Sequence, residues 1–329
     1  MSELEDSEAW REWIKTNGYV GAVGCSFTWG QGLWNYDTNN KNTPTYDEYI
    51  FQGIEPTLDS QKVREKLRYP RLLANHFGTD ELSKALNGGC DAQSIDILND
   101  VIHSRSQNPE MKGKWPLDKM RLLIFQHSAV VRCNHLFNFN GKKYRIELRS
   151  DGSVQDEIWE VKERGDLYHR DKWEKERYEE LACGDEDGRR VSSDIFFNYL
   201  VSVGMNIDEF WLHHCRRWLR RVQDTLRKFD DLGIPIVCWH WDIDLINVIH
   251  EEEFEWIRSI TAPIIVNDKS YSHYMEAAIP NHRDLFIRYD KEANRYGEDK
   301  DEHPSKWGME VITSSILKNL QDRDITIYL

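Results

Sequence analysis

Short apolar runs recur along the 329-residue chain, separated by stretches whose apolar residues are spaced as in amphipathic helices. Runs of this length predict strands. We expect them near 18–24, 83–87, 121–126, 234–239 and 263–267. Strands that alternate with helices favour a parallel sheet with helices on both faces. The pattern therefore predicts an α/β fold on a central, mainly parallel five-stranded sheet.

The intervening segments carry helical spacing and helix-end residues. Helices are expected at 70–77, 92–104, about 205–230 and 304–320. The first begins at Pro70 and stops at Gly78, and Pro304 suits the first position of the last helix. Proline at the start and glycine just past the end are typical of helix boundaries.

Two segments do not fit the alternation. Residues 33–66 are polar and rich in Asn and Thr, so we expect a long loop with a short helix at its end. Residues 133–190 contain a hairpin signal, Phe139-Asn-Gly-Lys142, and then a heavily charged helical stretch at 170–182. We interpret residues 1–329 as one α/β domain that carries the 133–190 segment as an insertion.

The first predicted strand leads into a glycine-rich turn. Residues 24–32 read Gly-Cys-Ser-Phe-Thr-Trp-Gly-Gln-Gly, which places Ser26 at the tip. A serine at a strand-to-turn junction is a recurring way to present a nucleophile. Cys25 is expected to point into the core instead. A purely structural glycine turn is the alternative for this segment.

A serine nucleophile needs a base, and the base needs an orienting carboxylate. Near the end of the chain, Asp301-Glu-His-Pro304 offers both. Pro304 biases His303 toward an extended conformation, in which residues two apart face the same side. Asp301 can then contact the His303 ring. The structural alternative is an acidic loop that precedes a helix.

Polar residues also follow the other predicted strands. They are Asn87-Gly-Gly89, Gln126-His-Ser128, His240, Asp242, Asp244 and Asn267-Asp268. Ligands bind at the carboxyl ends of strands in open parallel sheets. The amides of Ser26 and Gly89 are candidate donors to an oxyanion. Candidate substrate contacts are Trp29, Gln126, Trp241 and Asp242. Trp34 and Trp239 extend the same aromatic group, with core packing as the alternative.

These blocks resemble the SGNH (GDSL-type) hydrolases, in a divergent branch found in bacteria and tailed phages. The matching blocks are Gly24–Gly30, Asn87–Ser94, Gln126–Ser128 and Asp301–Pro304. The resemblance implies a three-layer α/β/α fold and ester hydrolysis through an acyl-enzyme. It further implies that Ser26 attacks, His303 transfers the proton, Asp301 orients His303, and Gly89 donates to the oxyanion.

The chain departs from the family pattern at three places. Cys25 stands where the family has Asp. The acid and base are spaced Asp-x-His rather than Asp-x-x-His, so Asp299 is an alternative to Asp301. The third block lacks the expected Asn, which leaves Ser128 or His127 as the oxyanion donor.

Composition argues against some classes of function, such as nucleic-acid binding and membrane insertion. The formal net charge of −14 disfavours nucleic-acid binding. No run reaches the length of a membrane span, and the acidic N-terminus does not resemble a Sec signal peptide. We expect no membrane partner and a cytoplasmic protein, or a virion component if a phage encodes it. The six cysteines (25, 90, 133, 183, 215 and 238) are scattered, so we expect reduced, mostly buried thiols.

Neither a metal nor a nucleotide is expected. His213, His214 and Cys215 are neighbours on a predicted helix and point in different directions, so they do not converge on one metal. The basic run Arg216–Arg221 is interpreted as a solvated helix face, with anion binding as the alternative. The glycine turn at 24–32 matches no nucleotide-binding motif. We therefore predict no cofactor.

Three functions stay open at this stage. We favour a serine esterase that removes an acetyl or other short acyl group, with a small-molecule or carbohydrate ester as substrate. An O-acyltransferase would use the same triad. A non-catalytic structural or binding protein, such as a virion component, could keep the fold. The oligomeric state is left open.

Overall fold

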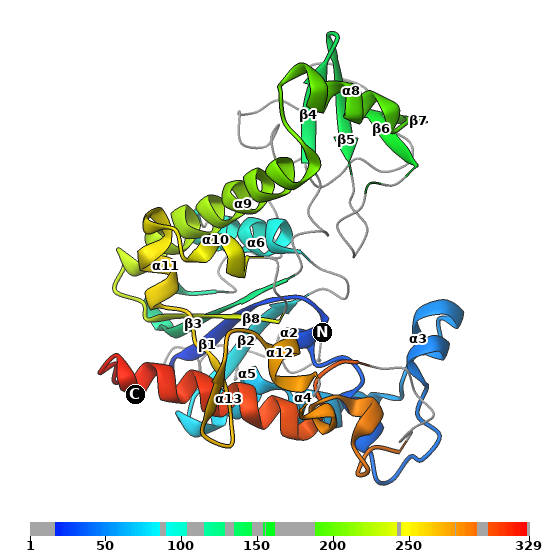
Figure 1. Ribbon diagram of the computed structural model, residues 1–329. Coiled ribbons are helices and arrows are strands. Elements are labelled where there is room, and N and C mark those ends of the chain that lie inside the picture. The colour runs from blue at the N-terminus through cyan, green and yellow to red at the C-terminus, as the bar shows by residue number, and fades with distance from the viewer. Residues whose placement is uncertain are drawn as a thin grey trace.

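A central parallel sheet forms the middle of this mixed α/β protein (Figure 1). The computed structural model describes residues 17–85, 90–103, 115–128, 135–146, 154, 156–161, 188–241, 245–279, 281–294 and 302–327. The sheet has the order β2-β1-β3-β8, and all neighbours are parallel. Its strands are β1 (Tyr19–Gly24), β2 (Asp80–Ala85), β3 (Met120–His127) and β8 (Ile236–His240).

The strand predicted near 263–267 forms, but its place in the central sheet is wrong, because the described sheet has four strands. Residues 264–266 form β9 (Ile264–Val266), which pairs antiparallel with β10 (Lys269–Tyr271) in a separate hairpin. Asn267 and Asp268 both have positive φ (49° and 63°), and two such residues make the tight turn that reverses a strand. An isolated bridge between Cys238 and Thr261 is all that extends the described sheet beyond β8.

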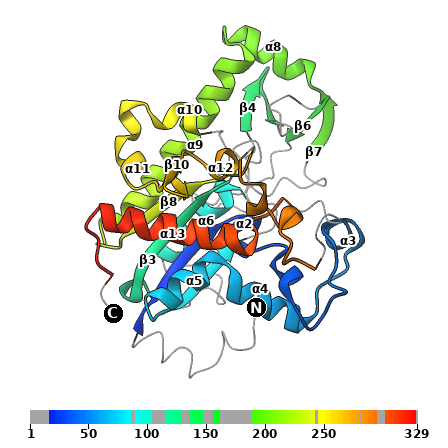
Figure 2. The same ribbon diagram turned by 60° about the horizontal axis from the view of Figure 1, so that its bottom comes forward.

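Helices cover both faces of the sheet, which gives three layers. On one face lie α6 (Asp91–His103) and α9 (Ile207–Asp230); on the other lie α5 (Tyr69–His76) and α13 (Lys306–Asp322) (Figures 1 and 2). These four helices lie within two residues of their predicted bounds. Ser305 caps α13 by accepting the Gly308 N–H at 3.0 Å, so Pro304 precedes the helix instead of starting it.

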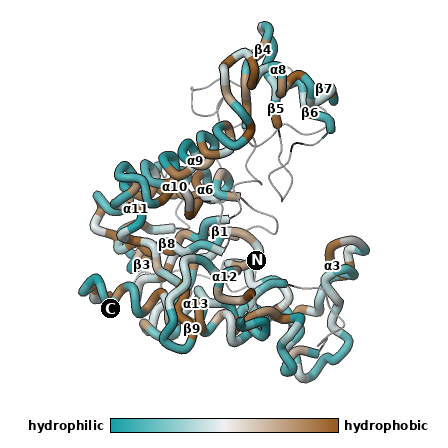
Figure 3. The backbone as a smooth tube through the Cα atoms, viewed as in Figure 1, coloured by the Kyte–Doolittle hydropathy of each residue, from teal (hydrophilic) through white to brown (hydrophobic). Residues whose placement is uncertain are grey.

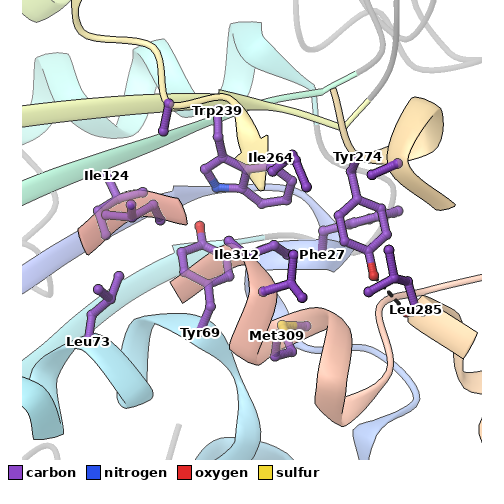
Figure 4. Close-up of a cluster of buried hydrophobic side chains, with 14 of the residues drawn as sticks. Phe27, Tyr69, Leu73, Ile124, Trp239, Ile264, Tyr274, Leu285, Met309 and Ile312 are labelled. Atoms are coloured by element: carbon purple, nitrogen blue, oxygen red, sulfur yellow. Dashed lines mark hydrogen bonds between the residues drawn. The ribbon is translucent and has the colours of Figure 1, made fainter. Parts of the chain in front are cut away.

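Each face has its own hydrophobic core. Leu123, Phe125 and Trp218 belong to the core under α6 and α9. Figure 4 shows the other core, where Trp239, Tyr69 and Ile312 pack between the sheet, α5 and α13. In Figure 3, α9 alternates between hydrophobic and hydrophilic residues, as expected for a helix with one buried side. No helix in the described ranges is long and apolar enough to cross a membrane.

The segment 33–66 has more structure than its polar sequence predicts. It contains η1 (Leu33–Tyr36), α3 (Tyr46–Gln52) and α4 (Leu58–Leu67). Thr45 and Glu48 form a capping box at the start of α3, and Thr57 caps α4. α3 projects away from the sheet (Figure 1).

The 133–190 region contributes a second, antiparallel sheet of order β4-β5-β6-β7. Its strands are β4 (His135–Phe139), β5 (Lys142–Ile146), β6 (Glu157–Val161) and β7 (Gly188–Ser192). The predicted hairpin is present, with Asn140 and Gly141 at positive φ in its turn. The helical prediction at 170–182 lies outside the described residues. We refer to β4–β7 and α8 (Asp194–Ser202) as the inserted unit, which stands beside the N-terminal part of α9 (Figure 1).

The remaining described helices are short. They are α2 (Ser26–Trp29), η2 (Leu117–Lys119), α10 (Ile246–Ile249), η6 (Glu252–Phe254), α11 (Glu255–Ser259), α12 (Tyr274–Ala278), η7 (Arg283–Leu285) and η8 (Ile287–Tyr289). Two of them position the candidate site: α2 begins at Ser26, and the segment around η7 and η8 contacts the strand-like loop that contains His303.

Candidate active site

The fold brings Ser26 and His303 together, although 277 positions separate them. Ser26 Oγ lies 2.7 Å from His303 Nε2. Ser26 is the first residue of α2, directly beyond the carboxyl end of β1, and its side chain is buried. His303 is half-buried. A hydroxyl that donates to an imidazole Nε2 is the geometry that a serine nucleophile and its base require.

The turn at Ser26 is tightly built. A Cβ atom on Gly24 would lie 2.3 Å from Thr28 Oγ1 and 2.5 Å from Gln126 Oε1, so glycine is required there. Gly30 ends α2 at a φ of 79°, and its N–H donates to the Ser26 carbonyl at 2.9 Å. The Ser26 N–H opens α2, where no carbonyl of the same helix can accept it. It therefore keeps its place as a candidate oxyanion donor.

The Gln126 side chain holds this turn in place through hydrogen bonds. Its Oε1 accepts the Cys25 N–H at 3.0 Å and the Thr28 hydroxyl at 2.9 Å, and its side chain is fully buried. Its Nε2 lies 3.0 Å from Cys25 Sγ. This corrects the prediction that Gln126 contacts substrate, because a buried amide with these partners holds the turn instead. Cys25 is also fully buried, so it points into the core as expected.

The loop around His303 is fixed by its backbone. The Ile287 N–H donates to the His303 carbonyl at 3.0 Å, and Phe286 pairs with Pro304 in an isolated bridge. The rings of Phe27 and Tyr46 lie 5.1 Å and 6.0 Å from the His303 ring. The imidazole is therefore held between the Ser26 turn and the first residue of α3.

Four predicted site residues lie outside the described residues. They are Gly89, Asp242, Asp299 and Asp301. The identity of the carboxylate that orients His303 and the glycine donor to the oxyanion therefore stay predictions.

Two residues of the third block, His127 and Ser128, form hydrogen bonds with Asp91. The Ser128 N–H and hydroxyl both donate to Asp91 Oδ1, at 2.7 Å and 3.1 Å, and His127 Nδ1 lies 2.9 Å from Asp91 Oδ2. Both Ser128 donors are thus directed at Asp91, which argues against Ser128 as an oxyanion donor, and the donor from the third block stays a prediction. Asp91 is fully buried at the start of α6. Sequence reasoning missed it, although an acidic residue directly before the helix predicted at 92–104 was the available signal.

His127 also stacks on His240, from the neighbouring strand. Their ring centroids are 4.3 Å apart and their planes differ by 6°. Each side chain is 1% exposed. Burial, and then the imidazoles of His127 and His273, hold the pKa of His240 well below its usual range. His240 is therefore neutral at neutral pH.

The aromatic candidates divide into two groups. Trp34 and Trp239 are fully buried and belong to the core. Trp29 is covered by the Arg64 guanidinium, 3.9 Å from its ring, and by Tyr49. Trp241 is half-buried, and its ring lies 4.9 Å from that of Phe27. Trp241 is thus a half-buried aromatic candidate that contacts Phe27, whose ring in turn contacts that of His303.

The basic run on α9, the possible metal ligands and the cysteines were also candidate sites in the sequence. Arg216 and Arg220 form ion pairs with Glu251 and Glu253, as expected of a solvated helix face. In the described part of the chain, no three His, Cys, Asp or Glu side chains are placed to hold a metal. The cysteines that the structure describes, Cys25, Cys90, Cys215 and Cys238, are free and buried, as predicted.

No protein-family model matches the chain, and no curated protein sequence matches it. Among solved structures, it is similar to an acetyl xylan esterase, Est2A, from the rumen bacterium Butyrivibrio proteoclasticus. The two chains are 11% identical, with a TM-score of 0.39. The match covers 92% of this chain and 63% of that enzyme, so this chain spans less than two thirds of its length.

Proposed function

We propose that the protein is a serine hydrolase that cleaves carboxylic esters. The observation that carries this proposal is the 2.7 Å contact between Ser26 Oγ and His303 Nε2 at the carboxyl edge of a parallel sheet. The half-buried imidazole and the buried, tightly held hydroxyl match a base and its nucleophile.

In the proposed reaction, Ser26 Oγ attacks the acyl carbonyl carbon while His303 Nε2 takes the hydroxyl proton. The resulting oxyanion accepts hydrogen bonds from the Ser26 and Gly89 amides. The carbon–oxygen bond to the alcohol then breaks, and His303 returns the proton to the departing alcohol. A water molecule then attacks the acyl-enzyme in the same way, with His303 as the base, and the carboxylic acid is released from Ser26. Asp301, or Asp299, is assigned the role of orienting His303.

A short acyl group, such as acetyl, fits the crowded surroundings of the base. The rings of Phe27 and Tyr46 flank His303, and Trp241 packs on Phe27. We assign the alcohol side of the ester to a small molecule or a carbohydrate. Transfer of the acyl group to another alcohol would use the same groups, with the acceptor in place of water.

Fluorophosphonate labelling and p-nitrophenyl acetate hydrolysis test the proposal together. Wild-type protein should label on Ser26 and release p-nitrophenol. Ser26→Ala and His303→Ala should lose both signals, whereas Ser202→Ala, at an exposed serine of α8, should retain them. A wild-type protein that neither labels nor turns over the ester would favour the non-catalytic alternative.

A further inference from the structure

A second pair of buried histidines joins the inserted unit to α9. His135, the first residue of β4, and His214, in the middle of α9, bring their Nδ1 atoms to 3.1 Å. His135 is 6% exposed and His214 is 0% exposed. The rings also pack on Phe210, which belongs to the core of the inserted unit. This pair therefore lies at the junction of the inserted unit and the central layers.

The hydrogen bond permits one proton between the two nitrogens. Arg217 Nη1 also lies 3.5 Å from His135 Nδ1 and is a donor. A guanidinium N–H can only donate, so the Arg217 contact favours the tautomer in which His135 Nδ1 accepts and His214 Nδ1–H donates to it. Protonation of His135 Nδ1 removes this acceptor and directs a positive ring at the Arg217 cation.

Among the described residues, the titratable groups that act on His135 oppose its protonation. On α9 these are His214, Arg217 and, farther away, His213. On β5, the residue paired with His135 is the apolar Ile146, and Arg145 lies over Trp159. α8 contributes Phe196, which packs on Phe210. Burial, and then His214, Arg217 and His213 of α9, hold the pKa of His135 well below its usual range.

We propose that the His135–His214 pair makes the attachment of the inserted unit to α9 sensitive to pH, so that the unit loosens in mild acid. An unfolded histidine takes up its proton near pH 6.5, and the docked His135 does so at lower pH. The docked state is therefore fully favoured above about pH 6.5 and loses stability as the pH falls below it. The ratio of docked to loosened unit falls by at most about tenfold per pH unit for this single site.

The loosening has a route to the candidate active site. Trp241 packs against the core of the inserted unit and also against the core that contains Phe27. Phe27 in turn contacts the His303 ring. The Trp241 carbonyl also accepts the Met275 N–H at 3.0 Å, which anchors its backbone to α12. Movement of the inserted unit thus changes the packing beside the base.

Hydrogen exchange measured by mass spectrometry tests the proposal on the full chain. Protection factors, corrected for the intrinsic effect of pH, should fall in β4 and β5 by about tenfold or more between about pH 7.5 and about pH 5. Any fall in β1 and β3, which share a sheet with the buried His240, should be unchanged by substitution of the histidine pair. The double variant His135→Asn/His214→Asn keeps amide groups in the Nδ1 positions but cannot titrate there, and it should lack the fall in β4 and β5. His76→Asn, at an exposed histidine, should behave like the wild type.

Two results would overturn the proposal. One is unchanged wild-type protection of β4 and β5 across this pH range. The other is an equal loss of protection in the double variant. If the double variant does not fold, the imidazole ¹⁵N resonances of the wild type decide the question. His135 should stay neutral on Nδ1 through about pH 6, and titration of the docked state near 6.5 would contradict the proposal. Neither measurement depends on whether the protein is an esterase.

Discussion

Two polar clusters share the carboxyl edge of the central sheet, and they differ in what surrounds them. Ser26 and His303 meet beside the core formed with α5 and α13, and the His303 ring is half-buried. Asp91 and His127 meet next to α6, where Asp91 is fully buried and His127 is 1% exposed. Both clusters contain a histidine with a close partner. One of them is partly exposed through the His303 ring, and the other is enclosed.

The two clusters also differ in the roles of the Asp91 carboxylate and the Ser26 hydroxyl. Asp91 accepts hydrogen bonds from a backbone amide, a hydroxyl and an imidazole, and so joins the start of α6 to the end of β3. Such a fully satisfied buried carboxylate stabilises the fold. Ser26 instead directs its hydroxyl at a histidine from the other end of the chain. Residue type alone does not separate a structural Asp–His pair from a reactive Ser–His pair, whereas burial and partners do.

The largest expected effect comes from removing the reactive pair. Ser26→Ala and His303→Ala should each lower kcat for p-nitrophenyl acetate by roughly 10³-fold or more, and the double variant should lose no more than the worse single variant. Residues that act as one unit show this lack of additivity. Losses that multiply in the double variant would mean that the two side chains act separately.

The enclosed pair should show the opposite behaviour. Asp91→Asn leaves His127 and Ser128 with an imperfect partner, so the free energy of unfolding should fall by about 2–4 kcal/mol. The turnover of the protein that remains folded should fall far less than in Ser26→Ala. Urea unfolding followed by tryptophan fluorescence measures the first quantity. An Asp91→Asn protein of unchanged stability and no turnover would place Asp91 in the chemistry.

The Thr28 hydroxyl, which helps to hold the turn that contains Ser26, should have a smaller effect on the reactivity of Ser26. Thr28→Val removes the donor to Gln126 and the contact with Tyr69 OH at 2.8 Å while it preserves shape, so Ser26 should label about tenfold more slowly with a fluorophosphonate. Thr28→Ser retains the hydroxyl and should label near the wild-type rate. Equal rates in the two variants would remove Thr28 and Gln126 from the positioning of Ser26.

The smallest effect should come from His240. Its pKa in the folded protein is held below the unfolded value of about 6.5, so it contributes stability above that pH and loses this contribution as the pH falls below it. His240→Phe should flatten the decline of the urea midpoint between about pH 7 and pH 5. A wild-type midpoint that does not change over this range would contradict this effect of burial.

The sequence predicted the parts of the site that local chemistry determines. The glycines around Ser26 and the proline after His303 mark a turn and a loop, and both are present. The partner of Gln126 could not be predicted, because Cys25 and Thr28 meet it across 101 and 98 positions of sequence. Asp91 was missed for the same reason.

The misjudged elements have local physical causes. Residues 264–266 are apolar enough for a central strand, but the turn at Asn267 and Asp268 reverses the chain before it can extend the sheet. In the segment 33–66, polar composition concealed the capping box that begins α3 at Thr45. Its helices pack through a few aromatic residues, such as Trp34 and Tyr49, which carry little periodic signal.

Trapping the acyl-enzyme tests the central claim most directly. Wild-type protein is mixed with p-nitrophenyl acetate, quenched in acid within the first turnover, and digested for mass spectrometry. We predict an acetyl group on Ser26, absent in Ser26→Ala, and a first turnover that is slowed in His303→Ala. Acetylation of Cys25 or of a residue outside this site, or ester turnover that persists in Ser26→Ala, would contradict the assignment of Ser26 as the nucleophile.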